Sequence, residues 1–207
     1  ANEQATLLAV ALDRDMKGVQ ASVLSRIGGQ QLAFATPYDL VDTFASAFAR
    51  FPYPESFFVW RAGDAAAGGE SFVFNRSDRL PAWDHGEQAA ALYPVVVRRD
   101  PRPLEEFLSM LRSAPPSQPI RLYEVVVAGQ PYQALVSAFY EYDGARRLVG
   151  SVGFLVNLAW VREHYFDGLT RQIASVVGDD SLALAILDER GALVTTTRPL
   201  AANDLVG

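Results

Sequence analysis

The sequence contains no cysteine and two histidines, His85 and His164, among its 207 residues. Without cysteine there can be no disulfide, thiolate zinc site, iron–sulfur cluster or cysteine nucleophile. Two histidines are too few for a multi-histidine metal site. A serine nucleophile has no support either, because Gly150-Ser151-Val152-Gly153 lacks the spacing of a nucleophile elbow. We therefore expect no catalytic residue, no metal and no cofactor, and predict that this chain is not itself an enzyme.

Positively charged residues are outnumbered by negatively charged ones. The chain has 18 Lys and Arg against 24 Asp and Glu, which gives a net charge of -6. An acidic surface repels polyanions, so nucleic acid is not an expected partner. The pairs Arg98-Arg99 and Arg146-Arg147 are too short to form a phosphate-binding stripe, and we predict that both lie in solvated turns.

Long apolar runs are missing as well, since no stretch of about 20 apolar residues is present. We expect no membrane span within this sequence, and no signal peptide is visible. The first residue is not Met, and the chain begins inside a helical pattern. We interpret the sequence as a piece of a longer protein.

What the sequence does contain is a long amphipathic pattern at its start. Six apolar residues lie four or three positions apart, which places them on one stripe of a helix: Leu8, Leu12, Met16, Val19, Val23 and Ile27. Gly28-Gly29 is expected to end this helix. The stripe suits packing within the domain, and its N-terminal half also suits a parallel dimer seam. A second helix is predicted from Pro37 to Arg50, after a Thr36 cap.

Strand patterns follow in two groups. Residues 56–61 and 71–75 predict a hairpin, residues 76–100 are predicted to be irregular with a short helix near 87–92, and residues 101–112 predict a helix. Residues 120–128, 132–142 and 148–158 then predict three antiparallel strands, because Gly129-Gln130-Pro131 and Asp143-Gly144 are typical turn sequences. A helix from 160 to 177 and a hairpin from 182 to 197 complete the pattern.

This order predicts an α+β fold in which a long N-terminal helix packs on a five-stranded antiparallel PAS-like sheet. The middle segment should cover the opposite face and leave room for a cavity between them. We expect three parts: a spine helix at 1–30, a membrane-distal sensor domain at 31–178, and the beginning of a second similar module at 179–207.

The sequence resembles the periplasmic sensor regions of bacterial histidine kinases built from PAS-like Cache modules. The resemblance covers the whole chain in element order. It rests on the opening helix and on four motifs: Phe-Phe-Val-Trp at 57–60, Arg-Leu-Tyr-Glu-Val at 121–125 with Gly-Gln-Pro-Tyr-Gln at 129–133, Gly-Ser-Val-Gly-Phe-Leu-Val-Asn-Leu at 150–158, and the hairpin at 184–194. Similar sequences end the last strand with an acidic residue, where this chain has Asn157, which argues against a cationic ligand there.

The resemblance implies an extracytoplasmic signal-input domain of an inner-membrane protein, with phosphotransfer in a separate cytoplasmic part. Such domains bind a small molecule and shift the helix that leads to the membrane, commonly as dimers through that helix. The alternative is a protein-interaction domain, or a receptor domain that binds no ligand, with another output such as a chemotaxis receptor or a diguanylate cyclase.

Two groups of residues are candidates for ligand binding. Trp83-Asp84-His85 lies in the irregular segment that should cover the sheet, where a ring can stack on a ligand and a polar neighbour can bond to it; the alternative is a surface loop held by one buried tryptophan. Arg121 and Tyr123 share one face of a strand, since alternate residues point the same way. With Tyr132 and Trp60 they suit an anion site, or aromatic pairs on a half-exposed sheet.

Overall fold

The computed structural model describes residues 10, 14, 17–28, 35–63, 69–85, 94–99, 102–113, 120–141, 147–177, 185–187 and 193–196. The chain divides into two compact units. The larger unit comprises residues 18–157, and the smaller one comprises residues 1–17 together with residues 158–207.

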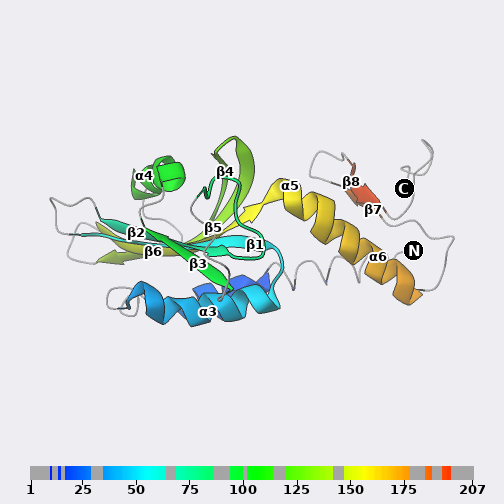
Figure 1. The fold of residues 1–207 in the computed structure, drawn as a ribbon, viewed down its shortest axis with the longest axis horizontal. Coiled ribbons are helices and arrows are strands. Elements are labelled where there is room, and N and C mark those ends of the chain that lie inside the picture. Colours follow the sequence, from blue (N-terminus) through cyan, green and yellow to red (C-terminus); the bar gives the residue numbers. More distant parts are fainter. Residues whose placement is uncertain are drawn as a thin grey trace. The chain divides into compact units, whose positions relative to one another are not determined.

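The larger unit is built on one antiparallel sheet with helices on both faces (Figure 1). The chain order of its strands is β1 (Pro54–Arg61), β2 (Glu70–Arg76), β3 (Val95–Arg99), β4 (Ile120–Val127), β5 (Gln130–Glu141) and β6 (Arg147–Asn157). Their order across the sheet is β3-β2-β1-β6-β5-β4. The predicted α+β class, the first hairpin and the three consecutive strands at 120–158 are confirmed.

The sheet has six strands where the sequence predicted five. The additional strand is β3, which lies at the edge beside β2 and falls within the segment expected to be irregular. Its Val95-Val96-Val97 run is β-branched and therefore favours extended backbone. Arg98 and Arg99 belong to this strand, so the prediction that they form a solvated turn is wrong. The short helix expected near 87–92 lies outside the described residues.

One face of the sheet packs against helix α3 (Pro37–Arg50). Thr36 caps this helix as predicted: its backbone N–H donates to Asp39 Oδ2 at 2.6 Å, and the Asp39 N–H donates to Thr36 Oγ1 at 3.4 Å. Phe44 points from α3 onto the sheet, 4.6 Å from both the Phe57 and the Phe74 ring centroids. Residues of this face form an apolar, mainly aromatic layer, which we call the α3 layer.

The opposite face is covered by helix α4 (Glu105–Ser113), which follows a 3₁₀ turn, η2 (Arg102–Leu104). Phe58 from β1 meets Phe107 from α4 edge to face, at 5.5 Å and 89°. Beneath Phe58 lies Gly153 of β6, where any Cβ would collide with the Phe58 ring and come within 2.5 Å of the Leu135 carbonyl oxygen. The absence of a side chain at 153 thus allows the ring to lie against the sheet. We call α4 and the side chains on this face of the sheet the α4 layer.

The described part of the first helical segment ends earlier than predicted. Lys17–Val19 are helical and continue into a π-helix, η1 (Gln20–Leu24). Ser25 closes the helix, because both its N–H and its hydroxyl donate to Gln20 O at 3.0 Å. Ile27 is buried but lies beyond the helix, and Gly28 does not end it. Of the predicted stripe, Val19 and Val23 are buried; Leu8, Leu12 and Met16 lie outside the described residues.

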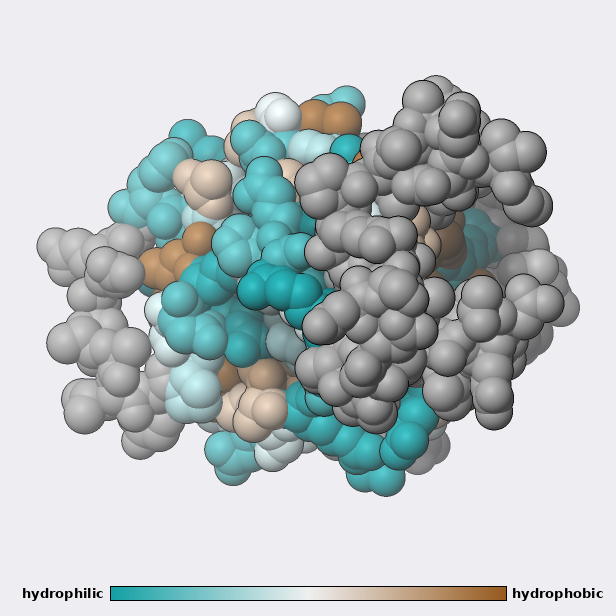
Figure 2. Space-filling model, turned by 90° about the vertical axis from the view of Figure 1, so that its right-hand side faces the viewer, coloured by the Kyte–Doolittle hydropathy of each residue, from teal (hydrophilic) through white to brown (hydrophobic). Residues whose placement is uncertain are grey.

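In the smaller unit, α5 (Leu158–Trp160), the π-helix η3 (Val161–Tyr165) and α6 (Phe166–Val177) form a continuous helical stretch, as predicted for 160–177. The hairpin β7 (Ala185–Leu187) and β8 (Leu193–Thr196) is antiparallel, also as predicted. The three-part division at 1–30, 31–178 and 179–207 stays a prediction. No helix within the described ranges is long and apolar enough to cross a bilayer. On the side shown in Figure 2, the described surface is mostly hydrophilic with smaller hydrophobic patches.

Candidate functional site

A β-bulge at the start of β1 turns Glu55 into the α4 layer. Pro54 pairs with Val156 and Ser56 pairs with Leu155, so Glu55 is an extra residue between two consecutive partners. An extra residue lets neighbouring side chains point to the same face of a sheet. Glu55 accordingly lies on the side of Ser56, where its side chain is only 4% exposed.

Four residues form what we call the Glu55 cluster: Glu55, Arg79, Tyr132 and Asn157. The Tyr132 hydroxyl donates to Glu55 Oε2 at 2.5 Å, and Asn157 Nδ2 donates to Glu55 Oε1 at 3.3 Å. Tyr132 and Asn157 are cross-strand partners on β5 and β6. The Arg79 Nε atom lies 3.9 Å from Glu55 Oε1, while its Nη2 donates to the carbonyl oxygens of Pro52 and Pro54.

Burial dominates the electrostatics of this cluster. Desolvation raises the pKa of Glu55, and the bonds from Tyr132 and Asn157 and the charge of Arg79 only partly oppose it. Burial also raises the pKa of Tyr132, and the neighbouring Glu55 raises it further. Burial lowers the pKa of Arg79 to about 10, which still leaves the guanidinium charged at neutral pH. The environment of Glu55 therefore favours the neutral form of its carboxyl group more than water does.

A second polar chain crosses the same face and forms what we call the Asp84 network: Ser56, Asn75, Asp84 and Arg98. Ser56 Oγ donates to Asn75 Oδ1 at 2.6 Å, and Asn75 Nδ2 donates to Asp84 Oδ2 at 2.7 Å. Arg98 Nε reaches both Asp84 oxygens, at 2.8 and 3.1 Å. The Asp84 side chain is 3% exposed, so its charge is neutralised by Arg98 rather than by water.

Nearer the other end of β1, two buried polar atoms have no hydrogen-bond partner in the described structure: Trp60 Nε1 and Ser151 Oγ. Trp60 and Ser151 lie directly opposite each other on β1 and β6. The Arg112 guanidinium of α4 sits 5.8 Å from the Trp60 ring. Buried donors and acceptors are nearly always satisfied in proteins, so a pair that lacks protein partners calls for an explanation.

The structure places the predicted site residues in three situations. Trp60, Trp83 and Tyr132 are buried together in the core of the α4 layer, and Asp84 anchors the polar network beside them. Arg121 and Tyr123 lie on the same face, but on the edge strand β4, where Arg121 Nη1 donates to the Tyr123 hydroxyl at 3.3 Å. His85 is exposed. Trp83 is thus a buried anchor, whereas His85 lies at the surface.

Several residues of the two polar groups were not identified from the sequence: Glu55, Asn75, Arg79, Arg98 and Asn157 as a partner of Glu55. Glu55 carried a usable signal, because it is a single charge in the apolar run from Phe51 to Trp60. Arg79, Arg98 and Asn75 carried none, since their roles depend on the register of β2 and β3 and on the bulge.

No group of three or more His, Asp or Glu in the described part of the chain is arranged to hold a metal ion. The chemistry that these groups offer is therefore hydrogen bonding and charge pairing.

The chain matches no protein-family model and no curated protein. Among solved structures, it is similar to the periplasmic domain of RsbU from Chlamydia trachomatis, with a TM-score of 0.41 and 12% identity over 95% of this chain and 61% of that one. It is also similar to the periplasmic sensory domain of the Campylobacter jejuni chemoreceptor Tlp1, with a TM-score of 0.35 and 11% identity over 100% of this chain and 70% of that one. The chain spans about three fifths of the RsbU domain.

Proposed function

We propose that this chain is the ligand-sensing, extracytoplasmic input region of a membrane-anchored signalling receptor, with a histidine kinase as its parent protein. The observation that carries the proposal is the concentration of buried polar groups in the α4 layer. The Glu55 cluster, the Asp84 network and the Trp60–Ser151 pair all lie on the α4 side of the sheet. Burying such groups is costly, and a fold that needed only stability would have apolar residues here.

The chemistry of this layer defines the class of ligand. The Trp60 N–H and the Ser151 hydroxyl have no hydrogen-bond partner among the described residues and can bond to an oxygen atom of a small molecule. Aromatic rings next to them supply apolar surface, as in most small-molecule sites. Glu55 has lone pairs in excess of the two bonds it accepts, so a ligand N–H or O–H suits it. We infer a small polar metabolite with both donors and acceptors.

Strand β5 offers a route from this layer to the helices on the other side. Tyr132 of β5 belongs to the Glu55 cluster, and η1 packs against the same strand. A ligand that binds one arrangement of the Glu55 cluster more tightly shifts the population toward that arrangement, by no more than its difference in affinity. The resemblance described above supports output through the N-terminal helix, in a homodimer.

The test is a metabolite screen by thermal shift with the 207-residue chain, covering amino acids, amines, sugars, nucleosides and organic acids. We expect at least one compound that raises the melting temperature with saturation. Trp60→Phe keeps the ring and removes the N–H, and Glu55→Gln removes the ionisable group; both should weaken binding of the compound about tenfold or more. Glu105→Gln, an exposed change on α4, is the matched control and should bind normally.

A broad screen without a stabiliser, or a stabiliser that binds equally well to all three variants, contradicts the proposal. In that case the second candidate function gains support, a domain that recognises a partner protein. The edge strand β4 favours it, because Leu122 and Val126 are 57% and 72% exposed. Apolar side chains on an unpaired edge are suited to contact with another chain.

A further inference from the structure

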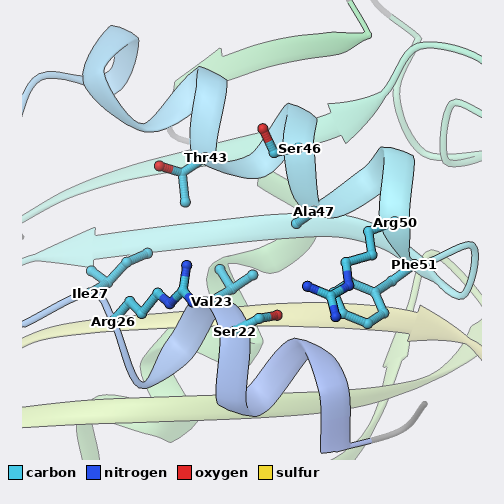
Figure 3. Close-up of a pocket in the computed structure, with 9 residues that line it drawn as sticks. All are labelled: Ser22, Val23, Arg26, Ile27, Thr43, Ser46, Ala47, Arg50 and Phe51. Carbon is cyan, nitrogen blue, oxygen red and sulfur yellow. The ribbon is translucent and has the colours of Figure 1, made fainter.

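A separate pocket lies on the other side of the sheet, between η1 and α3 (Figure 3). Its volume is about 320 Å³, at the lower end of the range for small-molecule sites. Its apolar surface comes from Val23, Ile27, Ala47 and Phe51, which are all at most 7% exposed. Gly18 allows η1 to approach closely here, since a Cβ at that position would lie 2.5 Å from the Phe51 ring.

Two guanidinium groups reach into this pocket. Figure 3 shows Arg26 extending from the end of η1 and Arg50 from the end of α3, with Val23 between them. Arg50 lies 5.2 Å from the Phe51 ring centroid, which holds it over the apolar surface. Among the residues that the structure describes, the pocket is lined by no Asp or Glu, and Arg26 forms no ion pair. The described lining of the pocket therefore carries two positive charges and no carboxylate.

Three residues with hydroxyl groups are also among those that line the pocket. Thr43 and Ser46 line it from α3, and Ser22 lines it from η1. Ser22 Oγ donates to the Gly18 carbonyl oxygen at 2.5 Å, so that hydroxyl is left as an acceptor. The residues of η1 are wound as a π-helix, an irregularity that proteins often place at functional sites.

We propose that this pocket binds a small organic anion, a carboxylate with a compact apolar body. The guanidinium groups of Arg26 and Arg50 bind the carboxylate, since arginine matches the planar geometry of that group. The body of the ligand covers Val23, Ile27 and Phe51. An inorganic anion satisfies the arginines but leaves this apolar surface uncovered, so size and apolar character set the preference. The ligand contacts both η1 and α3 and stabilises their packing.

The experiment is isothermal titration of the 207-residue chain with benzoate, isovalerate, acetate and inorganic phosphate at constant ionic strength, up to about 10 mM. We expect saturable binding of benzoate and isovalerate, and binding of acetate and phosphate at least about tenfold weaker. Arg26→Gln and Arg50→Gln should each weaken benzoate binding about tenfold or more. Arg102→Gln changes an exposed arginine on the α4 side, and should bind benzoate as the wild type does.

A variant that retains both arginines tests whether benzoate needs the space of the pocket and not only the positive charge. Ser46→Leu fills the pocket from an exposed helical position, where leucine favours the helix, and should abolish benzoate binding while the chain stays folded by circular dichroism. Equal affinity for phosphate and benzoate, unchanged binding in Arg26→Gln and Arg50→Gln, or no saturable binding overturns the proposal. Glu55→Gln should leave benzoate binding unchanged, so this site and the α4-layer site succeed or fail separately.

Discussion

The two faces of one sheet are packed by opposite kinds of chemistry. In the α3 layer, Phe44 stacks on Phe57 with 12° between the rings, and Phe154 and Tyr53 extend the aromatic contacts. In the α4 layer, apolar side chains share the interior with a buried carboxyl group, a buried ion pair and unpartnered polar atoms. Both layers are built on the same strands, so the difference lies in the side chains that alternate strand residues present to each face.

The contrast indicates a division of labour between the faces. Apolar contacts in the α3 layer have no directional requirement and chiefly supply stability. Polar groups in the α4 layer contribute little net stability when paired and cost free energy when unpaired. We expect substitutions in the α3 layer to unfold the domain and conservative substitutions in the α4 layer to change its response to pH and ligands.

The largest effect is expected for Phe44→Ala. Phe44 is fully buried against the rings of Phe57 on β1 and Phe74 on β2. Its truncation should therefore lower the free energy of unfolding by about 3–5 kcal/mol. Tyr38→Ala is the control on the same helix, because Tyr38 is 83% exposed, and should change it by less than about 0.5 kcal/mol. Urea denaturation measures both. A cost below about 1 kcal/mol for Phe44→Ala would mean that this layer is not the principal source of stability.

A smaller, pH-dependent effect is expected for Glu55→Gln. Desolvation raises the folded-state pKa of Glu55 above its usual value, so the contribution of this group to stability is greatest in acid and falls as the pH rises through that pKa. Glutamine does not ionise, so the variant does not lose stability in this way as the pH rises. Between about pH 4 and neutral pH, the melting temperature of the variant should therefore rise relative to that of the wild type as the pH rises.

Glu105→Gln provides the reference for this pH series, because Glu105 is exposed on α4. Its curve should run parallel to that of the wild type. If the Glu55→Gln curve runs parallel too, or falls relative to the wild type toward neutral pH, burial does not govern the ionisation of Glu55.

The smallest effect is expected for Ser151→Ala. Ser151 Oγ is buried without a partner among the described residues, so removing it should leave the free energy of unfolding unchanged or raise it by up to about 1 kcal/mol. Ser56→Ala is the matched change on the same face, where the hydroxyl donates to Asn75, and should cost about 1–3 kcal/mol. Urea denaturation measures both free energies of unfolding. Similar losses for the two serines would contradict the view that the Ser151 hydroxyl lacks a hydrogen-bond partner.

Elements with a strong local pattern were predictable from the sequence. Helix α3 has a proline at its first position, a Thr36 cap and an apolar face, and strands β4 to β6 are separated by turn sequences. Strand β3 was missed because it is short and lies at an edge of the sheet. The early end of η1 was missed because π-helical winding leaves no mark in the apolar spacing.

The site was predictable only in part, because its polar contacts join residues distant in the sequence. Trp83 and Asp84 were identified as a cluster, since a tryptophan beside a polar residue stands out in an irregular segment. The partners of Asp84 are Asn75 and Arg98, and the partners of Glu55 are Tyr132 and Asn157. These pairs depend on the strand register and on one bulge, which a single sequence does not specify.

The packing of Phe58 on Gly153 sets the height of α4 above the sheet. Phe107 rests edge-on against Phe58, and Phe58 in turn lies on a bare stretch of backbone. The two rings set the distance between α4 and the sheet, and that distance is short because residue 153 has no side chain. A methyl group at position 153 would push Phe58, and α4 with it, away from the sheet, and so loosen the packing over the buried polar groups without altering any of them.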